Sequence, residues 1–262
     1  MPNFILDNYT LFVIVLGTLF LGVANGVLGV FTVLKKQALV GDALSHATLP
    51  GVVLAFIFTG AKDMWILLLG AAISSLVAML LIEAIKRVSK IKDDALLSLI
   101  LASFFGIGQV LLLLIQGGGN AHSSGLQNFI FGQAATMLLS DVYLIAGISI
   151  LVLTLIILFY KELKLFVFNR DYFYSLGFSS KIMSALLTMM TVLVVTISIR
   201  TVGVILMSAF LIAPSVSARQ WSNRLVHNLV LAGLFGVMAG VGGSLISSQV
   251  TNLPTGPVIV VV

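Results

Sequence analysis

Apolar residues fall along this chain in long runs, and short polar connections separate them. The longer runs reach the roughly 20 residues that a helix needs to cross about 30 Å of hydrocarbon. None alternates like a barrel strand, and a helix satisfies its own backbone groups within lipid. We therefore predict an all-α, polytopic transmembrane helical bundle with about eight spans, at residues 9–31, 43–60, 64–85, 95–116, 142–160, 182–199, 202–216 and 229–248.

A further apolar run, residues 129–139, is too short to cross a bilayer. It contains Gly132 and Gln133. Short or irregular segments at membrane depth occur where protein buries them. We predict a re-entrant or interfacial helix here, held against the bundle.

Composition agrees with a membrane protein of one domain. Of the 262 residues, 60% are hydrophobic and 9% are charged, and the mean hydropathy is +1.18, whereas soluble domains are roughly half apolar and a quarter charged. The longest connection, residues 161–181, is a loop with an amphipathic piece, and no glycine-rich phosphate loop ending in Gly-Lys-Ser/Thr occurs. We expect residues 1–262 to form a single transmembrane domain, with any ATP hydrolysis on a separate chain.

Basic residues lie almost entirely on one side of the predicted spans. Lys62 and Arg200 fall on the other side. Cytoplasmic connections are enriched in lysine and arginine, so the basic side is predicted to be cytoplasmic and the amino terminus to face outward. The net charge of +5 then needs no nucleic-acid partner. The residues on the basic side are Lys35, Lys36, Lys86, Arg87, Lys90, Lys92, Lys161, Lys164, Arg170, Lys181, Arg219 and Arg224.

Asp42 and His46 are ionisable residues within the apolar segment GDALSHATLPG. At this spacing a helix places carboxylate and imidazole on one face, about one turn apart, and charge within a span is costly and usually kept for function. The pair suits a divalent cation such as manganese or zinc, and the absence of cysteine argues against copper(I). Ser45 adds a hydroxyl nearby, and Pro50 predicts a kink because it removes a helical hydrogen bond.

These residues also permit a purely structural role. Asp42 follows Gly41 at a predicted helix start, where carboxylates commonly cap free amides, and His46 would then only pair with it. Two donors are fewer than the about four to six of a complete metal site, so a second copy of the chain or other spans would have to complete one. The spacing alone leaves capping and metal binding open, and the Pro50 kink has no necessary function.

Two further ionisable residues have ordinary interpretations. Asp141 is predicted to cap an interfacial helix rather than to relay protons. His227 is expected to be solvated in a cytoplasmic segment.

A polar segment follows the seventh predicted span, which we expect to end at Pro214. A short amphipathic cytoplasmic helix with an aromatic residue and two arginines suits docking onto a partner protein. It suits equally an interfacial helix that lies on anionic headgroups. The residues concerned are Pro214, Ser215, Ser217, Arg219, Trp221 and Arg224.

Three strings in the chain resemble the ABC-3 family, the permeases of bacterial manganese, zinc and iron ATP-binding-cassette importers. They are VFTVLKKQALVGDALSHATLPGVVLAF, VGVILMSAFLIAPSVSAR and the closing LPTGPVIVVV, and their order covers nearly the whole chain. The resemblance implies a type II importer-like fold in which Asp42 and His46 coordinate metal along the pathway. It also implies a coupling helix on the ATPase at residues 214–224 and a short helix near the external gate at residues 129–139.

The mechanism that the resemblance implies is alternating access in a homodimer, located in the bacterial plasma (inner) membrane. Two cytoplasmic ATP-binding subunits would drive the movement, and an external metal-binding protein would deliver the ion. No cofactor would be permanently bound. The transported ion would be Mn²⁺ or Zn²⁺, with Fe²⁺ as a third candidate, because the same ligands accept all three.

Alternatives from other classes are a secondary metal carrier driven by an ion gradient and a siderophore or vitamin B12-type permease. The first would need no ATPase. The second would want a wide vestibule without ligating groups, against which Asp42 and His46 argue. An intramembrane hydrolase is disfavoured because the sequence has neither an HExxH helix nor a second buried carboxylate near Asp42.

The closing string is shorter than the family pattern, in which a final span follows Pro-Thr-Gly. This sequence has about five apolar residues after that point. Because half a span would leave carbonyl groups unsatisfied in lipid, we expect the sequence to be truncated here.

Overall fold

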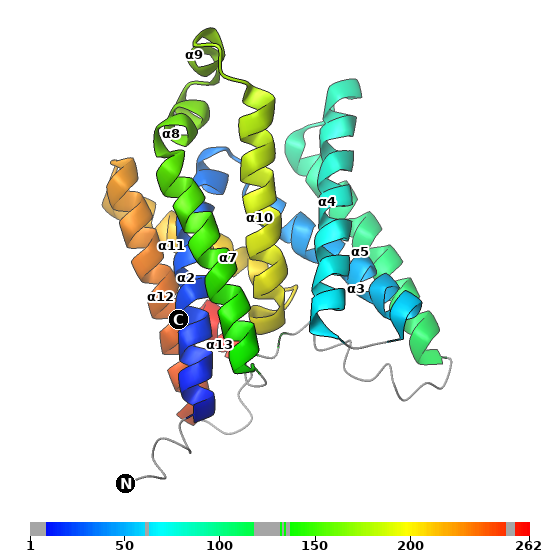
Figure 1. Cartoon of the computed structure of the whole chain (residues 1–262). Helices are drawn as coiled ribbons and strands as arrows, with labels where there is room; N and C mark the ends of the chain where they lie inside the picture. Colours follow the sequence, from blue (N-terminus) through cyan, green and yellow to red (C-terminus); the bar gives the residue numbers. More distant parts are fainter. Residues whose placement is uncertain (1–8, 61–62, 118–131, 133, 135–136, 250–254) are drawn as a thin grey trace.

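The computed structural model describes residues 9–60, 63–117, 132, 134, 137–249 and 255–262 (Figure 1). The regular elements within these residues are helices. They are α2 (Tyr9–Leu34), α3 (Val40–Thr59), α4 (Met64–Val88), α5 (Asp93–Gly117), α7 (Leu139–Leu158), α8 (Tyr160–Phe168), α9 (Arg170–Ser175), α10 (Ser180–Val202), α11 (Met207–Trp221), α12 (Leu225–Gln249) and α13 (Thr255–Val261).

Seven of the described helices, α2, α3, α4, α5, α7, α10 and α12, are long and apolar enough to cross a membrane. They coincide with seven of the eight predicted spans, which confirms an all-helical polytopic membrane protein. Short connections between apolar runs set their ends. Asp63, for example, begins α4 by accepting a hydrogen bond from the amide of Trp65 at 2.9 Å.

The predicted span at residues 202–216 has different bounds in the structure and is not among the seven long helices. Helix α10 continues to Val202 and ends at Gly203, whose φ of 91° favours glycine. Helix α11 then begins at Met207 and has 15 residues. Hydropathy did not reveal this break, because the residues on both sides of it are apolar.

We expected the helix to end at Pro214, but α11 continues to Trp221. Pro214 is buried within this helix. The next residue, Ser215, donates its hydroxyl to the carbonyl oxygens of Gly26 on α2 and of Leu211, each at 3.1 Å. Neighbouring helices and serine side chains commonly satisfy the backbone around prolines within membranes. No separate short helix follows Pro214 in this described stretch.

The predicted short helix at residues 129–139 lies largely outside the described residues. Of its described part, Gly132 has a φ of 74° and packs against the backbone of residues 201–203. Helix α7 begins only at Leu139. Gly132 therefore lies against the end of α10, where the connection to α11 begins.

Two groups of helices make up the bundle (Figure 1). In the first, α2 packs against α7, α11 and α12, and in the second, α3 packs against α4 and α5; α10 contacts members of both. Glycines permit the close crossings: a Cβ on Gly22 would overlap the backbone of Gly236, and one on Gly51 would overlap Gly70. Small residues at such crossings are typical of membrane helices.

The predicted cytoplasmic connections meet at one end of the bundle, the end from which α9 projects (Figure 1). One hollow there, of about 510 Å³, is lined by residues from the α2–α3 and α4–α5 connections and from α9 and α10. A second hollow is lined by α8 and the α11–α12 connection. The basic connections thus gather at a common end, as a single cytoplasmic side requires.

Candidate metal site

Asp42 and His46 lie on α3, which runs obliquely beside α4 and α5 (Figure 1). The Nε2 atom of His46 is 3.5 Å from Oδ1 of Asp42. The side chains are 14% and 28% exposed, respectively, so both remain partly accessible. The helical spacing therefore brings carboxylate and imidazole together, as predicted.

Asp42 is not the cap of α3. The helix begins at Val40, Leu39 holds the N-cap position, and no side chain makes a capping hydrogen bond there. Asp42 instead lies in the first turn, where the helix dipole still favours a negative charge. Asp42 therefore makes no capping hydrogen bond at the start of α3, and its contact with His46 is the pairing that the structure shows.

His46 has a ring nitrogen without a partner. Its Nδ1 atom is buried and makes no hydrogen bond, while the ring packs edge-on against Phe105 of α5 at a centroid distance of 4.8 Å. A buried polar atom without a partner costs free energy and calls for an explanation. Neutral imidazole nitrogens are common metal ligands, and a passing divalent cation would supply the missing partner.

Ser45 and Pro50 have different relations to this pair. Ser45 is buried and donates its hydroxyl to the carbonyl oxygen of Asp42 at 2.9 Å, so α3 itself satisfies it. Pro50 is buried within α3 and has no amide hydrogen to donate to the carbonyl of His46, four residues earlier. That carbonyl oxygen is therefore a further candidate metal ligand beside the imidazole.

The described residues bring no third His, Cys, Asp or Glu to the pair. His122, which the sequence places in a predicted external loop where a solvated histidine is expected, lies outside the described residues. As expected from the sequence, Asp42 and His46 by themselves are fewer donors than a complete metal site takes.

A buried polar pair in the centre of the bundle was not singled out from the sequence. Asn25 of α2 and Ser198 of α10 are fully buried. The side-chain amide of Asn25 donates to Ser198 Oγ and to the carbonyl of Leu21, each at 2.9 Å, while its Oδ1 has no partner. An asparagine inside a long apolar run was the available signal, because such groups are costly in a membrane unless bonded.

Asp141 and Arg200 form an ion pair between the start of α7 and the end of α10. Asp141 Oδ2 also accepts a hydrogen bond from the amide of Leu138 at 2.7 Å. This contact confirms that Asp141 caps a helix. The pair joins two helix ends at the end of the bundle opposite α9 (Figure 1).

The residues predicted to couple to an ATPase differ in their exposure. Pro214 and Ser215 are buried, and Ser215 bonds to α2, so they cannot touch a partner protein directly. Ser217, Arg219 and Trp221 are exposed at the end of α11. Arg224 is also exposed, and it lines the hollow between α8 and the α11–α12 connection.

Lys35, just after α2, lines the hollow below α9. Burial, with repulsion from Lys86 and Arg170, lowers the pKa of Lys35 to about 8. Its ammonium lies 5.4 Å from the centre of the Phe166 ring, a cation–π contact that partly offsets this cost.

Comparisons with known proteins agree with this architecture. The model of the ABC 3 transport family matches residues 7–262. The chain is 50% identical to the zinc transport system membrane protein TroC of Treponema pallidum, covering 98% of this chain and 86% of that protein. It is 46% identical to the manganese transport system membrane protein MntC of Bacillus subtilis, covering 93% of this chain but 56% of that longer protein.

A solved structure is similar over the whole fold. The structure of PsaBC from Streptococcus pneumoniae in complex with Fab contains a chain that is 30% identical, with a TM-score of 0.84. The match covers 100% of this chain and 92% of that chain.

Proposed function

Since this chain belongs to the ABC 3 transport family and is a membrane permease of a zinc or manganese ABC transport system, we propose that Asp42 and His46 hold its metal during translocation. The observation that carries this proposal is the His46 imidazole, whose buried Nδ1 has no partner and whose Nε2 lies 3.5 Å from Oδ1 of Asp42 on a membrane helix. The His46 carbonyl freed by Pro50 would add an oxygen donor. Coordination by so few groups would be weak, which allows release.

A second copy of the chain would supply the remaining donors on the two-fold axis of a homodimer. The proposal also places the chain in the bacterial plasma membrane as one permease domain over residues 1–262, with the amino terminus outside. Its partners would be an external metal-binding protein and two cytoplasmic ATP-binding subunits. ATP hydrolysis would take place on those subunits. The phosphate loop that it requires is absent from this sequence.

Both manganese and zinc remain candidates for the transported ion, with iron as a third. A carboxylate and an imidazole accept each of them, and affinity alone favours zinc over manganese. One relative is named for zinc and another for manganese. Metal content of the purified transporter after competition, read by mass spectrometry, distinguishes the three.

Helix α9 is a candidate docking element for the ATPase. It projects from the end of the bundle that we predict to be cytoplasmic (Figure 1), and Tyr172 and Tyr174 on it are 53% and 74% exposed. Its base is held because Phe173 is buried between the rings of Phe166 and Phe178. Exposed tyrosines on a supported element are typical of interaction hot spots. We place the docking surface on α9 together with Ser217, Arg219 and Trp221 of α11.

The metal assignment is tested by uptake of Mn²⁺ and Zn²⁺ into cells or liposomes that carry the assembled transporter. We expect Asp42→Asn and His46→Ala each to lower uptake about tenfold or more, because each removes a ligand. Asp63→Asn, at the exposed start of α4, is the matched control and should transport normally. Unimpaired uptake by both variants, with the ATPase still bound, would discard the site.

The secondary-carrier alternative makes a different prediction for the same liposomes. Uptake that persists without ATP and without the ATPase subunit would favour a carrier driven by an ion gradient. Uptake that stops when ATP is omitted favours the importer.

A further inference from the structure

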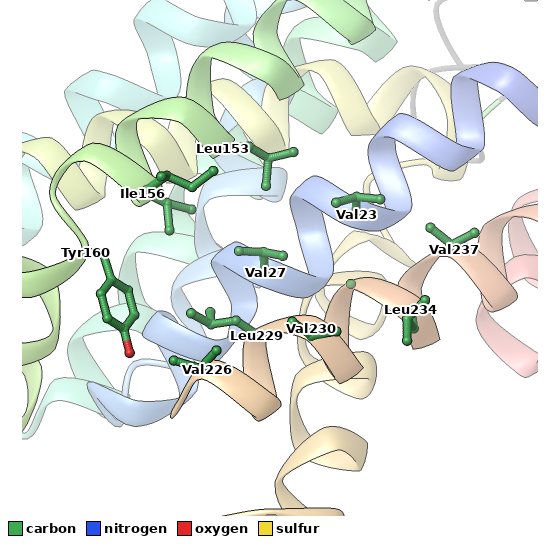
Figure 2. Close-up of a pocket in the computed structure, with 12 residues that line it drawn as sticks. Val23, Val27, Leu153, Ile156, Tyr160, Val226, Leu229, Val230, Leu234 and Val237 are labelled. Atoms are coloured by element: carbon green, nitrogen blue, oxygen red, sulfur yellow. The ribbon is translucent and has the colours of Figure 1, made fainter. Parts of the chain in front are cut away.

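An apolar groove runs along the membrane-facing surface between α2, α7 and α12. Figure 2 shows its lining, which includes Val23, Val27, Ile156, Val230 and Leu234. The groove has a volume of about 550 Å³. The hydroxyl of Tyr160 is the only polar side-chain group among the residues that line it.

A polar hollow of about 510 Å³ lies between α8 and the α11–α12 connection. Lys164, Arg224 and His227 line it, and its lining residues include neither Asp nor Glu. His227 is exposed, as expected from the sequence, and its Nδ1 is 3.5 Å from Ser222 Oγ. The hollow therefore presents positive charge without an internal counterion.

The groove and the polar hollow adjoin each other. Tyr160 and Val226 line both, and they stand together at one end of the groove (Figure 2). The joint lies at the cytoplasmic end of α7 and α12, where the membrane surface meets the helices. The apolar groove thus leads directly into the polar hollow at the level of the lipid headgroups.

We propose that the groove and the polar hollow together bind one anionic phospholipid of the cytoplasmic leaflet. An acyl chain lies in the groove, and the phosphate group lies near Lys164 and Arg224. Basic sites between membrane helices on the cytoplasmic side are suited to anionic headgroups. A purely apolar partner would leave the two cations unmatched, and a free phosphate would leave the groove unused.

This lipid site is separate from the metal pair. Figure 1 places α12 on one side of the bundle and α3, α4 and α5 on the other. The lipid proposal therefore does not depend on metal binding. The sequence left two roles open for Arg224, docking onto a partner protein and contact with anionic headgroups. The lipid proposal favours contact with headgroups.

The test is native mass spectrometry of the full chain with added phosphatidylglycerol or phosphatidylcholine. We expect the wild-type chain to retain phosphatidylglycerol preferentially. Lys164→Gln combined with Arg224→Gln should weaken phosphatidylglycerol binding about tenfold and remove the preference. Gly233→Leu should weaken binding of both lipids, because Gly233 lines the groove and a leucine there would occupy it.

Matched controls separate this site from general effects. Lys90→Gln combined with Lys92→Gln removes the same charge from the α4–α5 connection, outside both hollows, and should leave lipid binding unchanged. Gly233→Ala should also bind lipid, since a Cβ there would meet Val27 Cγ2 at an ordinary 3.4 Å. Circular dichroism checks that each variant is folded.

Four outcomes would overturn the proposal. The first two are equal retention of the two lipids by the wild-type chain, and a loss of phosphatidylglycerol in the Lys90 and Lys92 control equal to that in the Lys164 and Arg224 variant. The third is binding of inorganic phosphate that depends on Lys164 and Arg224 but not on Gly233. The fourth is disulfide crosslinking of two chains through Val230→Cys. The last outcome would make the groove a contact between copies.

Discussion

Lys35 shows how neighbours set the properties of a single residue. Its ammonium is largely buried below α9, with Lys86 and Arg170 near it and only Glu83 and Asp93 opposing them. The pKa is therefore lowered from 10.5 to about 8. The charged form is tolerated in the folded protein at a cost, which the Phe166 ring reduces.

We predict that Lys35→Met raises the thermal midpoint at pH 7 by about 2–4 °C, because it removes a costly buried charge. Between about pH 8 and pH 10.5 the unfolded chain binds this proton more strongly than the folded one, so wild-type stability rises with pH over that window. The advantage of the variant should shrink accordingly. Thermal unfolding in detergent across pH measures this, with the exposed Lys90→Met as control; a constant advantage at all pH values would contradict it.

Helix α12 shows how small residues decide where two elements meet. Gly236 approaches the backbone of Gly22 on α2 so closely that a Cβ would overlap its carbonyl oxygen. Gly233, one turn earlier, faces the open groove and has room for a methyl group. Position 236 of this helix therefore requires glycine, whereas position 233 does not.

Gly236→Ala should destabilise the protein by about 1–3 kcal/mol, since the helices must separate to admit the methyl group. Gly233→Ala should change stability by less than about 0.5 kcal/mol. Denaturation in mixed micelles compares the two variants. Equal stability losses would show that the crossing of α2 and α12 is not as close as described.

The Asp141–Arg200 pair ties α7 to α10. The two side chains are 10% and 19% exposed, so removing one partner leaves a largely buried charge unpaired. Asp141→Ala is expected to cost about 3–5 kcal/mol. In a double-mutant cycle Arg200→Met should recover part of this loss; strict additivity of the two variants would argue against the pair.

At the scale of the whole molecule, the end of the bundle from which α9 projects, predicted to be cytoplasmic, combines elements far apart in the sequence. Helix α9 and the end of α11 both present exposed aromatic residues there, with Tyr174 at 74% and Trp221 at 77% exposure. A partner that contacts both would couple ATP-driven motion to α10 and α2, against which these elements pack.

Tyr174→Ala and Trp221→Ala should each weaken association with the ATPase subunit about tenfold, as loss of a hot-spot aromatic does. Phe58→Ala, an exposed aromatic at the far end of α3, should have no effect. Co-purification and titration in nanodiscs measure the association. Weakening by Trp221→Ala alone would restrict docking to α11, and weakening by neither variant would contradict both sites.

Local patterns were enough to predict seven spans and the Asp42–His46 pair. Hydropathy depends on about 20 consecutive residues, and the i, i+4 spacing depends on one helical turn, so neither needs to know the neighbouring helices. The gathering of the basic connections at one end follows from the same alternation of spans. The family resemblance likewise rests on contiguous strings, and the match over residues 7–262 confirms it.

Only the tertiary structure decided how these helices use their polar and small residues. Ser215 is buried where its hydroxyl donates to the Gly26 carbonyl of α2, and the break at Gly203 lies against Gly132. The unpartnered Nδ1 of His46 depends on Phe105, about sixty residues away. The basic hollow joins α8 to a connection equally distant along the chain. Close approach and burial arise between helices, so no window of sequence contains them.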